Sequence, residues 1–362
     1  MFSLMARQRF EALDGMRGVA ALIVVVFHCD MVLGTRQIFP LGWLSVDLFF
    51  VLSGFVIALS YEGHLRDRFG FSNFMLARAH RLLPVHFCAM AMLTLVLCGM
   101  AAHHAFGPAI SVRAVLVESA LNSLFVPDSM SPVAGAFASM HNLFPLNPAQ
   151  WSLWDEWVVN IVYALLLFGM RTRILAIAGI LSAVMVLLVV VRAPQGWSVG
   201  EHNGEMVIGI LRALAGFSVG IVIFRLHKAG SLRRLPAVRP ELLYLFWMLA
   251  CATSPMRYRA IYEAGVATVV APVIIALLVR SERKMPRACN WIGALSYPLY
   301  ASHFAGLIFA SAMFDMFGLL PGVWRTVPMV FVTIGMAEIV RRLSDSFAMP
   351  GLSRFTTAKQ AT

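Results

Sequence analysis

Runs of about 20 apolar residues recur along the chain, separated by short polar segments, and a run of this length crosses a bilayer as an α-helix. We therefore expect an all-α fold, a polytopic membrane helix bundle of about ten transmembrane helices with no soluble domain. The seventh run is short. The predicted spans are residues 16–35, 42–61, 82–102, 150–170, 173–191, 206–226, 241–255, 260–280, 290–312 and 323–343.

The longest stretch without a predicted span is 103–149, which contains five prolines between 108 and 148. We expect an outer loop that packs on the bundle and carries a short surface or re-entrant helix around 111–126. The pattern thus predicts one transmembrane domain over residues 1–350, followed by a polar cytoplasmic tail over 351–362.

Composition supports the membrane class, because 60% of the residues are hydrophobic and 13% are charged. The net charge of +11 could suggest a nucleic-acid partner, but the basic residues lie between the apolar runs and no base-reading cluster accompanies them. With both termini in the cytoplasm, most of the 29 basic residues fall on the cytoplasmic side, as the positive-inside rule expects. The five cysteines have neither CxxC nor ligand-like spacing, so we predict no disulfide framework and no metal site.

Arg17 and His28 are the most informative polar pair, because they lie eleven residues apart on one predicted span. At a rise of about 1.5 Å per residue they share a helix face and are separated by about 16 Å along the axis. Arg17 alone could be an interfacial anchor, and His28 alone could be a packing residue. Together they suit a reaction inside the membrane with an anionic donor, in which His28 acts as a general base.

Three acidic residues are predicted near the outer surface, where His28 approaches it. Asp47 and Glu156 are surrounded by aromatic and aliphatic residues, so we expect them to be buried and functional. Asp155 is expected to be an exposed charge at a helix N-terminus, where the helix dipole stabilises it.

A second basic set, Arg66, Arg68, Arg78 and Arg81, follows the second span. Arg78 and Arg81 are three residues apart on a helix and could grip phosphates together by charge-assisted hydrogen bonds. In the ninth span Pro298 can open the helix and give Tyr297, Tyr300 and His303 a polar lining role, although a kinked core helix is the simpler interpretation.

Taken together, these segments resemble acyltransferase family 3, a family of integral membrane acyltransferases. The arginine, ten intervening residues and histidine of the family's first helix correspond to Arg17 and His28. The other similar stretches follow in the family's order: 46–57 with Asp47, Arg78 and Arg81 before Leu82-Leu83-Pro84, Trp151-Ser152-Leu153 with Glu156, Arg212 before Gly216–Gly220, and Ser296–Tyr300 with His303.

The resemblance implies transfer of an acyl group, often acetyl, from cytoplasmic acyl-CoA to a hydroxyl of a cell-surface or exported glycan, in a bacterial inner membrane. Arg17, Arg78 and Arg81 would bind the donor phosphates, and His28 would be the base or a transient acyl carrier. Asp47 or Glu156 would orient the imidazole or the acceptor. The substrate-binding residues would be Trp151, Ser152, Tyr297, Tyr300, His303 and Arg212.

Three alternatives stay open at this level. We expect neither the extra helix nor the hydrolase-like domain of the fused family members, so transfer could be direct or could use a separate periplasmic acyl-handling partner. A transporter of a lipid-linked or anionic substrate would also place charges inside the bilayer. A non-catalytic scaffold of a polysaccharide-export complex would need none of these buried polar residues.

Overall fold

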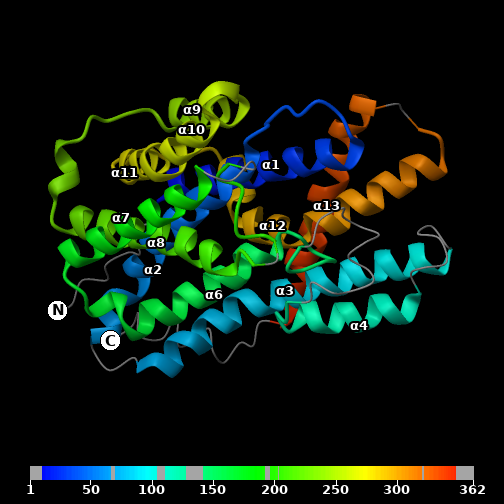
Figure 1. The fold of residues 1–362 in the computed structure, drawn as a ribbon, viewed down its shortest axis with the longest axis horizontal. Helices are drawn as coiled ribbons and strands as arrows, with labels where there is room; N and C mark the ends of the chain where they lie inside the picture. The colour runs from blue at the N-terminus through cyan, green and yellow to red at the C-terminus, as the bar shows by residue number, and fades with distance from the viewer. Residues whose placement is uncertain are drawn as a thin grey trace.

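The polypeptide is built from helices, in agreement with the predicted all-α fold. The computed structural model describes residues 10–66, 70–103, 111–127, 142–191, 196–202, 204–319 and 322–347, and within them there is no strand, only an isolated bridge between Asn142 and His202. The α-helices in chain order (Figure 1) are α1 (Glu11–Leu33), α2 (Ser45–Arg66), α3 (Gly70–Ala102), α4 (Val112–Ser123), α6 (Gln150–Leu165), α7 (Thr172–Val190), α8 (Met206–Lys228), α9 (Pro240–Ala252), α10 (Arg259–Gly265), α11 (Ala271–Val279), α12 (Arg287–Met316) and α13 (Thr326–Phe347).

Within the described residues, eight helical segments are long and apolar enough to cross a membrane. They coincide with eight of the ten predicted spans, and one of them joins α10, a π-helical turn (Val266–Val270) and α11. The predicted seventh span is the 13-residue helix α9, and the predicted fourth span is the 16-residue helix α6. The count of about ten therefore holds only if these two shorter helices are included.

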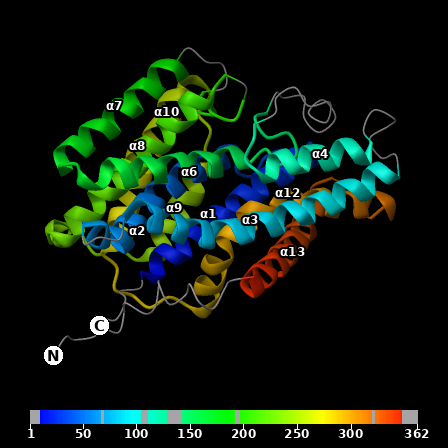
Figure 2. The ribbon, with the colours of Figure 1, turned by 90° about the horizontal axis from the view of Figure 1, so that it is seen from below.

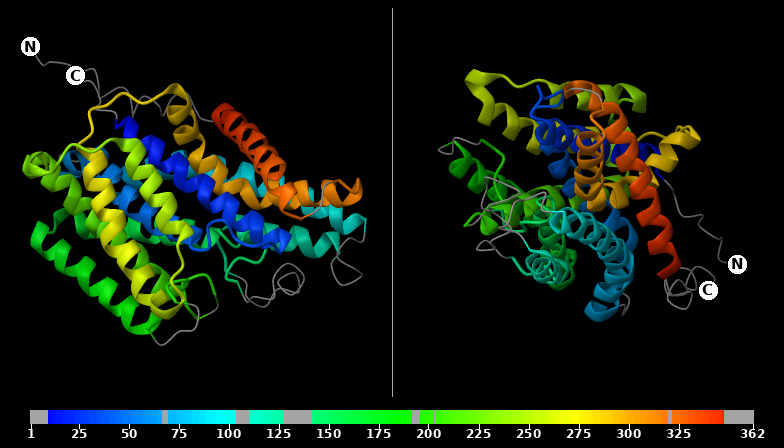
Figure 3. Two further views of the ribbon diagram at one scale, coloured as in Figure 1. Left: turned by 90° about the horizontal axis from the view of Figure 1, so that it is seen from above. Right: turned by 90° about the vertical axis from the view of Figure 1, so that its right-hand side faces the viewer.

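The helix pair α1 and α12 runs through the centre of the bundle, and α13 packs against α12 on one side (Figure 3). Helix α2 lies against α8, which is flanked by α7, whereas α3 lies toward the other edge with α4 beside it (Figure 2). The predicted helix at 111–126 is thus confirmed as α4. Leu143, Phe144 and Leu146 of the predicted outer loop are buried, so this described part packs on the bundle as expected.

The contact between α2 and α8 depends on glycine. A Cβ atom at Gly54 would collide with the backbone carbonyl of Phe217, and one at Gly220 would collide with the carbonyl of Val51. Small residues of this kind let membrane helices approach to backbone contact. The close approach positions the face of α2 that carries Ser53 toward α6.

Helix α1 ends in a way that fixes the region beyond His28. Gly34 adopts a left-handed conformation with φ of 62°, and its N–H donates to the carbonyls of Asp30 and Met31. The Asp30 carboxylate is fully buried and accepts a hydrogen bond of 2.8 Å from the Ile38 N–H. The loop after α1 is therefore held against the helix end.

Candidate functional site

A cavity of about 430 Å³ lies between α1, α2, α3, α6, α12 and α13. The structure brings Arg17, Arg78 and Arg81 together in its wall, although they come from two helices. The remaining charged residues of the wall are Asp14, Glu156, Arg341 and Asp345. Arg68, from the same basic set, lies outside the described residues.

Arg78 is the most tightly held of the three predicted arginines. Its side chain is 4% exposed, and it donates a hydrogen bond of 2.9 Å to Glu156 Oε1, which also accepts one of 2.8 Å from the Ser53 hydroxyl. The Nε–H of Arg78 is buried and has no acceptor among the described residues. Arg17 lies 3.8 Å from Asp14, in a looser pair that is about one-quarter exposed. This end of the cavity thus offers guanidinium donors to an anion.

Hydroxyl groups and aromatic rings make up a less charged part of the wall, which includes Ser152, Tyr297 and Tyr300. The hydroxyls of Ser152 and Tyr300 are 2.6 Å apart, and Tyr297 donates to the Leu82 carbonyl at 3.0 Å. Pro298 has no N–H for the carbonyl of Ala294, so this carbonyl lacks its usual helical donor at the cavity wall. Even so, α12 continues as a helix through Pro298.

His28 and His303 lie next to each other beyond Tyr300. Their ring centroids are 4.8 Å apart, and neither residue lines the cavity. His303 Nδ1 lies 2.7 Å from the Tyr300 carbonyl, and His28 Nδ1 lies 3.0 Å from the Val24 carbonyl. Since a carbonyl only accepts, each neutral ring carries its proton on Nδ1 and keeps a lone pair on Nε2. His28 is therefore oriented by its own helix, not by a carboxylate.

Asp47 does not orient the imidazole in this structure. Its carboxylate accepts hydrogen bonds from Arg212 at 3.0 and 2.8 Å and from the Trp197 indole N–H at 3.1 Å. Neither Asp47 nor Arg212 lines the cavity. The indole ring of Trp151 packs on the guanidinium of Arg212 at 5.1 Å. Asp47, Arg212 and Trp151 therefore form a buried assembly outside the lining of the cavity.

The expectation that Asp155 is exposed is wrong. Its residue exposure is 2%, and its Oδ2 is buried without a hydrogen-bond partner among the described residues. Asp155 faces α8, where a Cβ at Gly209 would lie 2.7 Å from this oxygen. Packing between α6 and α8 determines this burial, and the local sequence gives no sign of it.

Arg341 and Asp345, which line the same cavity, are not among the candidate residues predicted from the sequence. The acidic and basic residues at Glu338, Arg341 and Asp345 are spaced three and four apart, which places them on one face of α13. That spacing is the signal that could have singled them out. The described residues contain no group of three His, Cys, Asp or Glu side chains able to hold a metal.

Comparison with known proteins identifies the family. The model of acyltransferase family 3, described as an acyltransferase domain, matches residues 10–340. The chain belongs to acyltransferase family 3. This protein is therefore an acyltransferase, and together with its apolar helices the match makes it an integral membrane enzyme.

Three relatives are similar over much of the chain. A protein named as protein 2 in the picA locus of Rhizobium radiobacter is 34% identical over 51% of this chain and 96% of its own length. A protein named as the membrane-bound transacylase BcsY of Komagataeibacter xylinus is 25% identical over 84% of this chain and 75% of its own length. A protein named as the peptidoglycan O-acetyltransferase YrhL of Bacillus subtilis is 25% identical over 90% of this chain and 53% of its own length. No solved structure matches the chain significantly.

Proposed function

We propose that this acyltransferase moves an acyl group, most simply acetyl, from cytoplasmic acyl-CoA to a hydroxyl of a cell-surface or exported glycan. The observation that supports this best is the cavity whose charged part carries Arg17, Arg78 and Arg81 and whose wall ends at Tyr300, next to the two histidines. The glycan acceptor is supported by the name of the Bacillus relative, which is that of a peptidoglycan O-acetyltransferase.

The donor fits the cavity by its chemistry. Coenzyme A carries several phosphate charges at one end and a long neutral arm that ends in the thioester. The arginines would bind the phosphates, and the arm would lie along Phe49, Phe50 and Tyr300. Tyr300 lines the cavity and its ring lies 5.8 Å from that of His303, so the thioester would have to pass beside Tyr300 to reach the imidazole of His28.

Acyl transfer then needs one base. Nε2 of His28 takes the proton of the acceptor hydroxyl as its oxygen attacks the thioester carbonyl. The carbon–sulfur bond breaks, and the thiolate of coenzyme A takes the proton from the imidazolium. Glu156 holds Arg78 in place, and Asp47 supports the fold through Arg212. A transient acyl-imidazole on His28, or handover to a periplasmic partner, would be the two-step variant of the same reaction.

We propose a bacterial inner membrane as the location, with both termini in the cytoplasm, where acyl-CoA is made. This arrangement would leave His28 closer to the outer surface than Arg17 is. The glycan could then approach from the opposite side to the donor.

Purified protein in lipid nanodiscs, given radiolabelled acetyl-CoA and candidate glycans, tests this function. We expect label on the glycan and a loss of about 100-fold or more in the His28→Ala variant, the range that general bases contribute. His103→Ala removes an exposed histidine at the end of α3 and is the matched control. Normal transfer by His28→Ala at matched expression would rule out the base. Accumulation of unmodified substrate inside sealed vesicles that contain the same protein would point to a transporter instead.

A further inference from the structure

The last turns of α13 form a side of the cavity that the proposed reaction does not use. Arg341, Ser344 and Asp345 line the cavity together with Arg17 and Arg78, which belong to α1 and α3. The wall thus receives a fourth arginine from the far end of the chain. In the sequence, Arg341 and Arg342 lie at the end of the last predicted span, where cytoplasmic anchoring alone would explain them.

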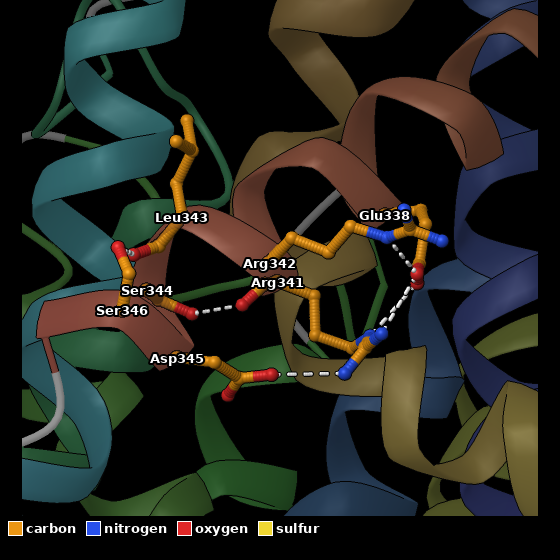
Figure 4. A network of polar contacts seen from close by, with 7 residues as sticks. All are labelled: Glu338, Arg341, Arg342, Leu343, Ser344, Asp345 and Ser346. Atoms are coloured by element: carbon orange, nitrogen blue, oxygen red, sulfur yellow. Dashed lines mark hydrogen bonds and ion pairs between the residues drawn. The ribbon is translucent and has the colours of Figure 1, made fainter.

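The guanidinium of Arg341 is held by two carboxylates of its own helix (Figure 4). Its Nε and Nη2 each donate to one oxygen of Glu338 at 2.7 Å, and its Nη1 donates to Asp345 at 2.9 Å. The contact to Glu338 is a two-point fork, which fixes the plane of the guanidinium. The contact to Asp345 is a single hydrogen bond from Nη1, the guanidinium nitrogen that does not bond to Glu338.

The two carboxylates differ in their surroundings. The Glu338 side chain is 19% exposed, whereas the Asp345 side chain is 65% exposed. An exposed single hydrogen bond is worth little, because water competes for both groups. Asp345 lines the cavity and Glu338 does not, so an anion in the cavity meets Asp345 first.

The charges of the cavity wall favour displacement of the Asp345 carboxylate from Arg341 by an incoming anion. Arg17 and Arg78 have carboxylate partners within the wall, Asp14 and Glu156. A phosphate that enters among these arginines repels Asp345 and offers Arg341 a stronger acceptor than the exposed carboxylate does.

We propose that Arg341 is a fourth donor-binding arginine, that Glu338 positions its guanidinium, and that a phosphate of the donor displaces Asp345 from Nη1. This rests on the proposed function, in which the donor is acyl-CoA. Asp345 occupies the phosphate position while the cavity is empty and lowers the affinity for the donor. Displacement of Asp345 would couple donor binding to the side-chain contacts at the end of α13.

Binding of coenzyme A to purified protein in nanodiscs, measured by calorimetry, tests the proposal without any need for turnover. For Arg341→Ala we expect about tenfold or more weaker binding, the usual effect of a lost hydrogen bond to a charged group. For Asp345→Asn we expect binding that is about twofold to fivefold tighter, because a weak competitor and a repulsive charge are removed. In steady-state assays Arg341→Ala should raise KM with little change in kcat.

Each variant has a matched control. Arg342 is also bonded to Glu338, is 75% exposed and does not line the cavity, so Arg342→Ala should leave binding unchanged. Asp315, in α12, is 64% exposed, pairs with Arg325 and does not line the cavity either, so Asp315→Asn makes the same charge change elsewhere. If each control changes the affinity as much as its partner variant does, net charge explains the effect and the proposal is overturned.

The outcomes separate the two proposals. If the wild-type protein does not bind coenzyme A, the donor assignment itself is wrong. If the wild type binds and Asp345→Asn binds no tighter, Asp345 is not the displaced group. Should Arg341→Ala fail to fold, as a thermal melt would reveal, Asp345→Asn and Arg341→Lys decide the question, since the lysine keeps the charge and loses the two-point fork.

Discussion

Asp47 and Arg212 are ion-paired in the interior, with 6% and 1% of their side chains exposed. Removing two charges from water is costly, and the cost is recovered only when geometry and further hydrogen bonds are good. Here the Trp197 indole N–H and the Val199 carbonyl, at 2.6 Å from Arg212 Nη1, complete the set. With its hydrogen bonds satisfied by the protein, the pair holds α2 to α8 and leaves neither group directed at a substrate.

We therefore expect Asp47→Ala and Arg212→Ala each to lower stability by about 3–5 kcal/mol, because each leaves one buried charge without its partner. Thermal unfolding of the purified protein in detergent measures this loss. The double variant Asp47→Leu with Arg212→Met should be more stable than either single variant, since no charge is left unpaired. A stable Asp47→Ala variant without acyl transfer would instead return Asp47 to the catalytic machinery.

At the scale of helices, two glycines determine how closely α2 and α8 approach. Gly54 faces the backbone of Phe217, and Gly220 faces that of Val51. Ser53, next to Gly54, donates to Glu156, which in turn holds Arg78. Helix packing and the position of Arg78, a proposed donor-binding residue, are thus linked through α2.

Gly54→Ala and Gly220→Ala should each push α2 away from α8 and cost about 1–3 kcal/mol, the usual range for overpacking. Thermal unfolding and the yield of folded protein after detergent extraction report the change. Gly63, in the same helix α2, has open space around it, so Gly63→Ala should be neutral or slightly stabilising. Equal effects at positions 54 and 63 would show that helix propensity, and not the close approach, matters here.

Hydropathy sufficed to predict the helices because crossing a bilayer requires a long apolar run, and this property is local. The family resemblance grouped Arg17, Arg78 and Arg81 as donor-binding residues, and the structure places them in one cavity. Tertiary partners are not local. The bond from Arg212 to Asp47 joins residues 165 positions apart, and the burial of Asp155 against α8 depends on how two helices pack. The role of Arg341 was not predicted because a basic residue at the cytoplasmic end of a span satisfies the positive-inside rule with or without a ligand.

For the whole molecule, contacts between distant segments place the start of α1 and the end of α13 at the same end. Asp14, Arg17, Arg341 and Asp345 line one cavity, and the Met285 N–H, just before α12, donates to Glu11 at 2.7 Å. A chain that crosses the membrane an even number of times has both its ends on the same side, in agreement with this arrangement. The donor proposal adds a direction, because acyl-CoA is available to the arginines only if this end faces the cytoplasm.

Cysteine labelling tests the direction. In a background with all five native cysteines replaced by alanine, Arg36→Cys and Arg257→Cys place a thiol on exposed loops of the predicted outer side, and Arg233→Cys and Lys284→Cys do so on the predicted inner side. A membrane-impermeant maleimide should label the first two in intact spheroplasts and the last two only after permeabilisation, because the more basic loops stay inside. The unmodified background should take no label. The reverse labelling pattern would mean that the arginine cavity faces the cell exterior, where coenzyme A thioesters are absent. The donor would then have to be a different acyl carrier, and the family assignment would still hold.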